Sequence, residues 1–309
     1  MNYSDFSPQT NLENLNSTLD EFGIAVLTNV IINEECNQFK KEIFKHLSKQ
    51  HDIHTTEDYY AKFRPMNGGL VHYYGLTLIR PVLDLKTDER VIEPFKRIWN
   101  ETDLTTSFDG MYIGPPPPPA DNESKYLFNL NQLSFHTDQS SDKVDKCCVQ
   151  AFINLEPTEH GDGCLSVLTN SHKYHAEFFQ HFKLSTNGKD WFRLKKTHLD
   201  WFINEKKCEF KMICAPKGSM VFWDSRTIHM GTLRRQMDSK WRFLVYVCYT
   251  PACLQTDQDK HLKQVAYVQN RLTSHWPYGS VRLFDRREDD LMFNKLENLT
   301  ERHRKYFGV

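Results

Sequence analysis

Apolar runs separated by short polar turns dominate the middle of the chain. The runs are rich in β-branched and aromatic side chains, and Gly, Pro, Asn or Asp lie between them. They cover residues 148–155, 164–168, 210–215, 219–223 and 241–249. Short strands with turns of this kind are typical of an antiparallel jelly roll, cupins included. We therefore expect a mainly β fold with flanking helices, whose jelly-roll core spans residues 106–255.

Helical patterns flank this core. Residues 22–32 are apolar and β-branched, which predicts a strand, and Asn33 with two acidic residues behind it predicts the N-cap of the next helix. A short helix is expected near residues 91–99. A further helix is expected over about 257–272, where the segment Ser274–Pro277 ends it. Helices should therefore pack around the outside of the strands.

We expect the chain to form one domain, because its 309 residues show no obvious break. Residues 1–105 would supply an N-terminal strand and helices, and residues 256–309 a C-terminal helical extension. Residues 175–205, rich in Phe, Trp, Lys and His, interrupt the rhythm of strands and predict a lid or substrate-facing loop. Pro115–Pro119 predicts an extended connector, with docking to an SH3-type partner as the alternative.

Composition and charge argue against several function classes. The chain has 39 Lys and Arg against 40 Asp and Glu, a net charge of -1 and no long run of one sign. Binding to nucleic acid or a membrane surface therefore has no electrostatic support. The eight cysteines show no CxxC pair, which indicates free thiols in a reducing compartment. Because no signal core or membrane-spanning run is present, we expect a soluble cytoplasmic protein.

A histidine and a carboxylate lie two residues apart in the segment 133–139, LSFHTDQ. On a strand, residues i and i+2 face the same way, so His136 and Asp138 can point into one cavity. His229 ends a later apolar phrase, residues 218–229, and can supply a third ligand. Two histidines and one carboxylate with an open opposite face suit a non-haem Fe(II) oxygenase. The alternative is a chance pair of structural residues, since the chain has 14 histidines.

An arginine opens the strand expected at residues 241–249. Arg242 would share one strand face with Leu244, Tyr246 and Cys248, and an inward arginine among apolar side chains is costly unless an anion pairs with it. A dicarboxylate co-substrate meets this need, because its far carboxylate can accept two parallel hydrogen bonds from the guanidinium while its keto acid chelates iron. The alternative is an internal salt bridge between Arg242 and an aspartate.

Four motifs, in a fixed order along the chain, resemble those of the phytanoyl-CoA dioxygenase (phytanoyl-CoA hydroxylase)-like family of Fe(II)/2-oxoglutarate dioxygenases. They are a strand and helix opening (FGIAV at 22–26 and NEEC at 33–36), the HTD segment at 136–138, a hairpin (GDGCL at 161–165 and NSHK at 170–173), and the distal-histidine phrase at 218–231. The resemblance covers roughly residues 20–255 and implies a double-stranded β-helix core.

The resemblance also implies residue roles and a reaction. His136, Asp138 and His229 would bind Fe(II), and Arg242 would bind the distal carboxylate of 2-oxoglutarate. Thr232 stands where the family commonly has a serine hydroxyl, and is a candidate to assist. With O2 consumed and ascorbate as a candidate reductant, the implied reaction hydroxylates a substrate and releases succinate and CO2. Because related halogenases replace the carboxylate ligand by a small residue, Asp138 favours hydroxylation.

Residues near these motifs are further candidates. Gln132 and Gln139 flank the iron motif and can hydrogen-bond the co-substrate or the substrate, with a structural role as the alternative. Trp223 can line the pocket, but an aromatic side chain on an apolar strand is more often part of the core. His172 and His175 follow a turn and are expected to face solvent rather than metal.

The sequence favours hydroxylation of a small-molecule or lipid-like substrate that it does not name, and it leaves demethylation or another oxidative outcome open. One alternative is a catalytically inactive jelly-roll binding protein, which should lack a ligand or the arginine. A second is a dioxygenase acting on a peptide side chain. A third is a metal-dependent cupin enzyme of another reaction type, which would use more histidines and would not need Arg242. No basic patch marks a coenzyme A pocket, fold kinship is no guide to substrate, and no pattern predicts the oligomeric state.

Overall fold

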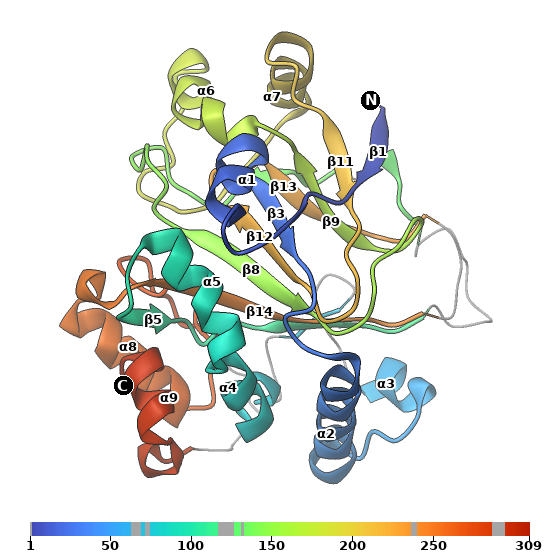
Figure 1. The fold of residues 1–309 in the computed structure, drawn as a ribbon, viewed down its shortest axis with the longest axis vertical. Coiled ribbons are helices and arrows are strands. Elements are labelled where there is room, and N and C mark those ends of the chain that lie inside the picture. Colours follow the sequence, from blue (N-terminus) through green and yellow to red (C-terminus); the bar gives the residue numbers. More distant parts are fainter. Residues whose placement is uncertain are drawn as a thin grey trace.

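Two facing β-sheets form the centre of the molecule, and helices surround them (Figure 1). The computed structural model describes residues 2–62, 69–71, 75–116, 127–130, 133–235, 240–285 and 294–309. The mainly β architecture with flanking helices agrees with the expected fold class, although the two sheets are not closed into a barrel.

The six-stranded sheet contains, in spatial order, β1 (Tyr3–Phe6), β11 (Phe210–Ile213), β9 (Cys164–Leu168), β13 (His229–Thr232), β7 (His136–Thr137) and β10 (Phe192–Arg193). The eight-stranded sheet contains β2 (Gln9–Thr10), β3 (Ile24–Leu27), β12 (Met220–Asp224), β8 (Val149–Asn154), β14 (Arg242–Pro251), β6 (Met111–Gly114) and β4 (Leu70–Val71), and β5 (Leu104–Thr106) also pairs with β14. All five strands predicted in the core are thus present. Most pairs are antiparallel, while β1 joins β11 and β2 joins β3 in parallel.

Apolar side chains from both sheets meet in a shared core. Val221 in β12 and Leu244 in β14 contribute from the larger sheet, while Leu165 and Val167 in β9 contribute from the smaller one. Alternation along each strand sends the intervening residues to the outer faces. This core therefore holds the two sheets together and defines which strand faces point inward.

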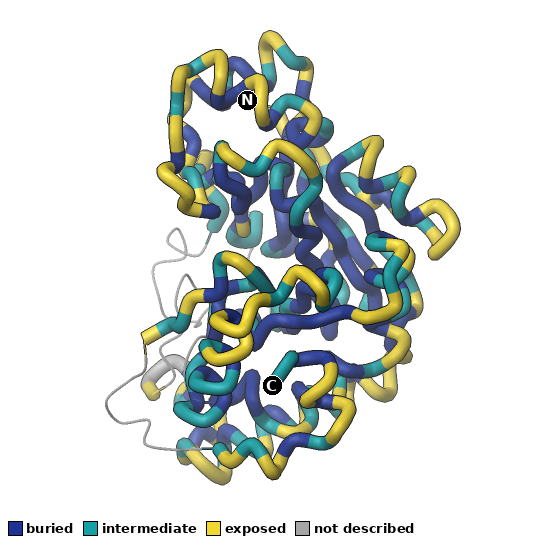
Figure 2. Tube along the Cα trace, turned by 90° about the vertical axis from the view of Figure 1, so that its left-hand side faces the viewer, coloured by how far each residue is buried: buried dark blue, intermediate teal, exposed yellow. Residues whose placement is uncertain are grey.

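Helices cover the outer face of the larger sheet. They are α1 (Leu15–Phe22), α2 (Asn33–His51), α3 (Thr56–Lys62), α4 (Arg80–Lys86), α5 (Glu89–Trp99), α8 (Asp257–Val268) and α9 (Glu301–Phe307). Leu19, Ile43 and Phe95 pack from α1, α2 and α5 against Ile153 and Val245 of the sheet. Figure 2 shows the resulting pattern, with buried segments through the middle and exposed residues on the outer turns.

The segment 175–205 covers the outer face of the smaller sheet. It contains α6 (His175–His181), β10 and α7 (Lys196–Asp200), followed by one π-helical turn. Its residues Phe178 and Phe202 are fully buried against Phe210 and Met230 of the sheet. Much of this segment is therefore structural cover, which the expectation of a lid or substrate-facing loop did not include.

Element boundaries differ from the sequence prediction where the backbone becomes left-handed. The strand expected over residues 22–32 is only β3, because Asn29 adopts a φ of 58° and the next two amides both donate to the carbonyl of Gly218. The C-terminal helix stops at Val268, before Asn270 with a φ of 54°. Helix α2 begins at Asn33, with Ile32 rather than Asn33 as its N-cap.

Among the helices that the structure describes, none is both long enough and apolar enough to cross a membrane. Of the proline run at 115–119, residues 117–119 lie outside the described ranges, so the connector stays a prediction.

Candidate metal centre

Two neighbouring strands of the smaller sheet hold the three predicted metal ligands. His136 begins β7 and His229 begins β13, and the two residues are directly paired across the antiparallel ladder. Asp138 follows β7, so alternation along the chain places its carboxylate on the same side as His136. Ligand atoms of the three side chains lie within 4.8 Å of one another, and no other such group occurs among the described residues.

Backbone carbonyls fix the orientation of both imidazole rings. Nδ1 of His136 lies 2.9 Å from the carbonyl oxygen of Ser134, and Nδ1 of His229 lies 2.8 Å from that of Thr227. Because a carbonyl only accepts, each Nδ1 carries a proton and donates it, and Nε2 is the nitrogen that each ring turns toward Asp138. Burial, aided by the nearby His229, lowers the pKa of His136 to about 4. His136 is therefore a neutral imidazole at physiological pH, as a metal ligand must be.

The carboxylate of Asp138 lies between these two rings. Its Oδ1 is 3.8 Å from Nε2 of His136, and its Oδ2 is 3.3 Å from Nε2 of His229. The Nε2 of Gln150, in β8, donates a hydrogen bond of 2.9 Å to the same Oδ2. Burial alone would raise the pKa of the Asp138 carboxyl, but the neighbouring His136 and His229 side chains outweigh burial and lower it. The carboxylate is thus ionised at neutral pH.

Two imidazole nitrogens and one carboxylate oxygen form a donor set that suits a divalent first-row metal. Arranged on one face, this set is the 2-His-1-carboxylate arrangement of non-haem Fe(II) oxygenases. The His136 side chain is 21% exposed, whereas that of His229 is 5% exposed. The cluster therefore opens to solvent on the side of His136.

Arg242 lies at the first position of β14, opposite Gly114 of β6. Leu244 and Tyr246 share its strand face and belong to the core between the sheets, so Arg242 starts from the inward face as expected. Its guanidinium carbon is 5.0 Å from the centre of the Tyr112 ring, and its buried Nε has no hydrogen-bond partner. An internal salt bridge is not found, because no described carboxylate pairs with Arg242.

Tyr246, four positions further along β14, shares the strand face of Arg242 and packs against the core between the sheets. Burial raises the pKa of its phenol. On another side, Arg242 lines a cavity of about 10 Å³ together with Arg234 and Asp162. A cavity of this size has room for roughly one water molecule.

Thr232, the one other predicted co-substrate residue that the structure describes, is not brought to the cluster. Thr232 pairs with Cys164 in β9, and its hydroxyl lies 3.1 Å from both the Cys164 sulfur and the Ser166 hydroxyl. Along β13, residues 229 and 231 face one side of the sheet and residues 230 and 232 face the other. Thr232 therefore points to the side opposite to His229. Gln132 lies outside the residues that the structure describes.

Four further candidates are buried structural residues. Gln139 donates to the carbonyl of Asp145 at 2.8 Å and accepts from the Ser225 hydroxyl at 2.8 Å, which ties down the loop after the HTD segment. The expectation that His172 and His175 face solvent is wrong, because they are 5% and 1% exposed. Their Nε2 atoms contact backbone carbonyls, each at 3.1 Å, so neither joins the cluster. Trp223 belongs to the core between the sheets, and its ring centre is 5.6 Å from that of His229.

Sequence reasoning missed three residues around the centre. Gln150 was read only as part of an apolar run, although a lone polar side chain in such a run indicates a buried partner. Trp276 donates from its indole nitrogen to the backbone carbonyl of Asp138 at 3.2 Å. His275, the neighbour of Trp276 in sequence, has a buried Nε2 with no hydrogen-bond partner among the described residues. Nothing in the sequence brings residues 275 and 276 to the HTD segment.

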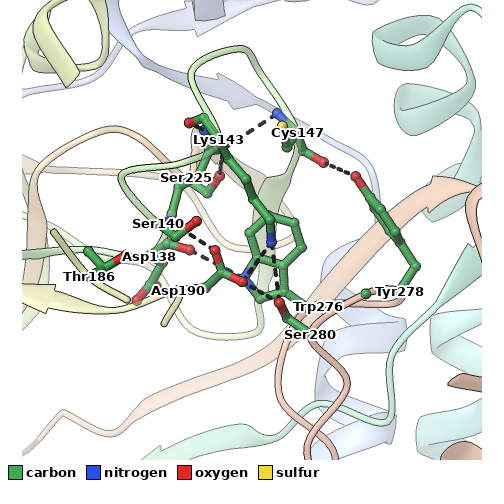
Figure 3. A network of polar contacts seen from close by, with 12 residues as sticks. Asp138, Ser140, Lys143, Cys147, Thr186, Asp190, Ser225, Trp276, Tyr278 and Ser280 are labelled. Atoms are coloured by element: carbon green, nitrogen blue, oxygen red, sulfur yellow. Dashed lines mark hydrogen bonds and ion pairs between the residues drawn. The ribbon is translucent and has the colours of Figure 1, made fainter. Parts of the chain in front are cut away.

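A polar network joins the loop after Asp138 to two distant parts of the chain (Figure 3). The carboxylate of Asp190 accepts from the Ser140 amide at 2.8 Å, from the Lys143 ammonium at 2.7 Å and from the Ser280 hydroxyl. The same ammonium lies 3.7 Å from the centre of the Trp276 ring. Residues of the 175–205 segment and of the C-terminal region thus hold in place the loop that follows Asp138, the candidate metal ligand.

Comparison with solved structures supports the predicted double-stranded β-helix. The hypothetical protein JW0805 from Escherichia coli is 12% identical, with a TM-score of 0.66 over 98% of this chain and 86% of that chain. The epimerase SnoN, in complex with Fe3+, alpha ketoglutarate and nogalamycin RO, is 14% identical, with a TM-score of 0.50 over 78% of this chain and 84% of that chain. At such identities these likenesses concern the fold alone.

Sequence comparison identifies the family. The Ava biosynthesis cluster protein O of Aspergillus versicolor is 24% identical over an alignment of 291 residues that covers 90% of this chain and 90% of that protein. A family model described as Phytanoyl-CoA dioxygenase (PhyH) matches residues 19–235, well over half of the 309 residues. The resemblance in the motifs is thereby confirmed. The protein belongs to the phytanoyl-CoA dioxygenase family, and so to the 2-oxoglutarate dioxygenase class of enzymes.

Proposed function

We propose that this protein is an Fe(II)- and 2-oxoglutarate-dependent hydroxylase of a small-molecule substrate, releasing succinate and CO2. In this proposal His136, Asp138 and His229 hold the iron, and Arg242 binds the far carboxylate of 2-oxoglutarate. The observation that carries the proposal is the convergence of two anchored imidazoles and an ionised carboxylate within 4.8 Å on one face of a sheet.

The donor set fits iron in both geometry and charge. Each imidazole is fixed by its Nδ1 bond, so Nε2 can bind a metal without a change of tautomer. The Asp138 carboxylate offsets one of the two metal charges, and Gln150 holds the Oδ2 atom in place. When bound, the iron supplies the activation of O2 and the oxidative decarboxylation of 2-oxoglutarate. The protein's own contribution is to hold both co-substrate and substrate in fixed positions beside it.

Arg242 has the properties of a carboxylate-binding residue. It starts on the inward face, stacks beside Tyr112, and has no carboxylate partner among the described residues. A partly buried guanidinium whose buried Nε has no partner is costly, and a bidentate pair with a carboxylate offsets that cost. Lysine presents a single point charge and would not reproduce such a pair.

A small-molecule substrate is favoured over a peptide side chain. The curated relative carries the name of a biosynthesis cluster protein, which is consistent with small-molecule chemistry. Incubating the enzyme with metabolite extracts and screening for mass gains of one oxygen atom would identify the substrate.

Succinate formation tests the proposal directly. The purified protein is incubated with Fe(II), ascorbate and 2-oxoglutarate, and succinate is measured with and without metabolite extract. His136→Ala should lose bound iron and succinate formation, whereas His54→Ala, at an exposed surface position, should keep both. The proposal fails if the wild-type protein forms no succinate under either condition and His136→Ala leaves the metal content unchanged.

A further inference from the structure

One aromatic side chain of the 175–205 segment differs from the others. Phe178 and Phe202 are fully buried and Trp201 is 2% exposed, all packed on the smaller sheet. Trp191 is instead 51% exposed, and its ring centre lies 6.0 Å from that of His136. About half of the indole is thus open beside the candidate metal centre, where an aromatic side chain can contact a ligand.

Strand register places a second residue on the same face. In β10, Arg193 is directly paired with His136 of β7, so their side chains lie on one side of the sheet. Trp191 is two positions earlier and shares that side by alternation. Phe192, between them, points the other way, where its ring centre is 5.3 Å from that of Phe179. The two residues that flank Phe192 therefore face the side from which His136 is exposed.

The charge of Arg193 is uncompensated in the described part of the chain. Its side chain is exposed, and its one hydrogen bond goes to the carbonyl of Leu133 at 3.4 Å. No described carboxylate forms an ion pair with it. A guanidinium in this state can pair with an anionic group of a ligand while its flat face stays open.

The base of this surface is held rigidly. Asp190, next to Trp191, is 8% exposed and accepts the three hydrogen bonds of the network behind Asp138 (Figure 3). The β10–β7 pairing fixes the other end of the same short stretch. A contact surface anchored on both sides loses little conformational entropy when a ligand binds.

We propose that Trp191 and Arg193 form the substrate-binding wall of the metal centre, and that the substrate is a small molecule with a flat apolar ring system and an anionic group. The ring lies against the indole of Trp191, and the anionic group pairs with Arg193. This assignment rests on the proposed function, because it takes the cluster of His136, Asp138 and His229 as the reacting centre.

Binding of three small probes tests the wall. The probes are 2-naphthoate, which has a ring and a negative charge, 2-naphthamide, which has the ring alone, and hexanoate, which has the charge alone. Binding is measured calorimetrically under nitrogen with Fe(II) and saturating 2-oxoglutarate, so that the site at Arg242 is already filled. We expect 2-naphthoate to bind the wild-type protein at least about tenfold more tightly than either other probe, a difference that corresponds to one good additional contact.

Variants assign each part of the probe to one residue. Trp191→Ala should weaken 2-naphthoate and 2-naphthamide alike, by about tenfold. Arg193→Gln should weaken 2-naphthoate but not 2-naphthamide, and Arg193→Lys should restore part of the loss. Leu254→Ala and Arg304→Gln, at exposed positions on other elements, serve as controls and should change nothing.

The outcomes separate this inference from the proposed function. Iron content and substrate-independent succinate formation are measured on the same preparations. If both persist but 2-naphthoate fails to bind the wild-type protein, or if Trp191→Ala and Arg193→Gln leave its affinity unchanged, the wall and its substrate class are refuted while the proposed function stands. If the wild-type protein neither holds iron nor forms succinate, the proposed function fails, and the assignment of a substrate wall fails with it.

Discussion

Replacement of Gln150 by methionine is the most direct test of how the candidate metal centre is held. Gln150, the second residue of β8, is 6% exposed, and its amide donates to Oδ2 of Asp138 at 2.9 Å. Methionine has nearly the same length and fits the same space, but it cannot donate. The substitution therefore removes one hydrogen bond to the Asp138 carboxylate and leaves the three candidate metal ligands unchanged.

The expected loss in metal affinity follows from what the hydrogen bond does in each state. Without metal, the freed carboxylate of Asp138 can turn toward His229, whose Nε2 is already 3.3 Å away. Metal binding must then pull it back into position. A hydrogen bond to a charged group is worth about 1.5–3 kcal/mol, and loss of a residue that supports a metal ligand typically weakens binding by roughly 10- to 100-fold. We expect a loss of that size for Gln150→Met.

The assay is calorimetric titration of the metal-free protein with Fe(II) under nitrogen. Asn154→Leu is the matched control, because Asn154 is a buried amide in the same strand whose side chain bonds to the carbonyl of Ala215, away from the cluster. That variant should lose stability but, where folded, keep the wild-type Kd for Fe(II). An unchanged Kd in Gln150→Met would mean that Asp138 is held equally well without this bond, and the reasoning would be refuted.

Three further predictions concern other parts of the molecule. Arg242→Gln should raise the KM for 2-oxoglutarate at least about tenfold, since a hydrogen bond to a charged group is worth about 1.5–3 kcal/mol. Arg242→Lys should also show a raised KM, and a wild-type KM in both variants would contradict the role assigned to Arg242. Burial lowers the pKa of Lys263 from 10.5 to about 7 in the folded protein. Between these two pH values the unfolded chain binds more protons than the folded one, so stability rises with pH. Lys263→Met should remove that rise and stabilise the protein near pH 7. The free energy of unfolding is measured by urea denaturation at about pH 7 and pH 9, and an equal change between the two pH values in both proteins would count against this prediction. Gly218 has a φ of 76°, and an added Cβ would lie 1.9 Å from the carbonyl oxygen of Ile31, so Gly218→Ala should lower the free energy of unfolding by roughly 3 kcal/mol or more. Gly188→Ala should lower it by only about 1 kcal/mol, because φ is 75° there but no atom lies within 4 Å of the added Cβ. Equal midpoints for the two variants in thermal denaturation would exclude the close contact as the cause.

The strands of the core were predictable because each one carries its own hydrophobic pattern. The prediction of residues 164–168 agrees with β9 at both ends. The strand expected at 22–32 was too long, because the side chains of Val30 and Ile31 are as apolar as those of β3 and the pattern gave no sign that the strand ends before them. What ends the strand is the left-handed turn at Asn29 and the pairing of both following amides with Gly218, which is a contact distant in sequence. The single-domain division of the chain stays a prediction.

The candidate ligands were predictable for a similar local reason. Alternation along one strand puts His136 and Asp138 on the same side, and the third residue, His229, ends a recognisable phrase of its own. Thr232 shows the limit of such reasoning, because a position close to the ligand in sequence lies on the opposite face of the same strand. Gln150, Trp276 and Trp191 reach the centre only through tertiary contacts, which no spacing in the sequence reveals.

The contacts around Asp138 explain why elements outside the two ligand strands matter to the site. Its carboxylate is held by β8 of the opposite sheet, and its backbone carbonyl by the C-terminal Trp276. The loop that follows it is tied through Asp190 to the segment that carries Trp191. A change in the position of that segment must therefore act on the candidate metal ligand Asp138 as well as on the proposed substrate surface. Substitutions in the Asp190 network should accordingly alter iron affinity and substrate affinity together, whereas Arg193→Gln, which leaves the network intact, should alter substrate affinity alone.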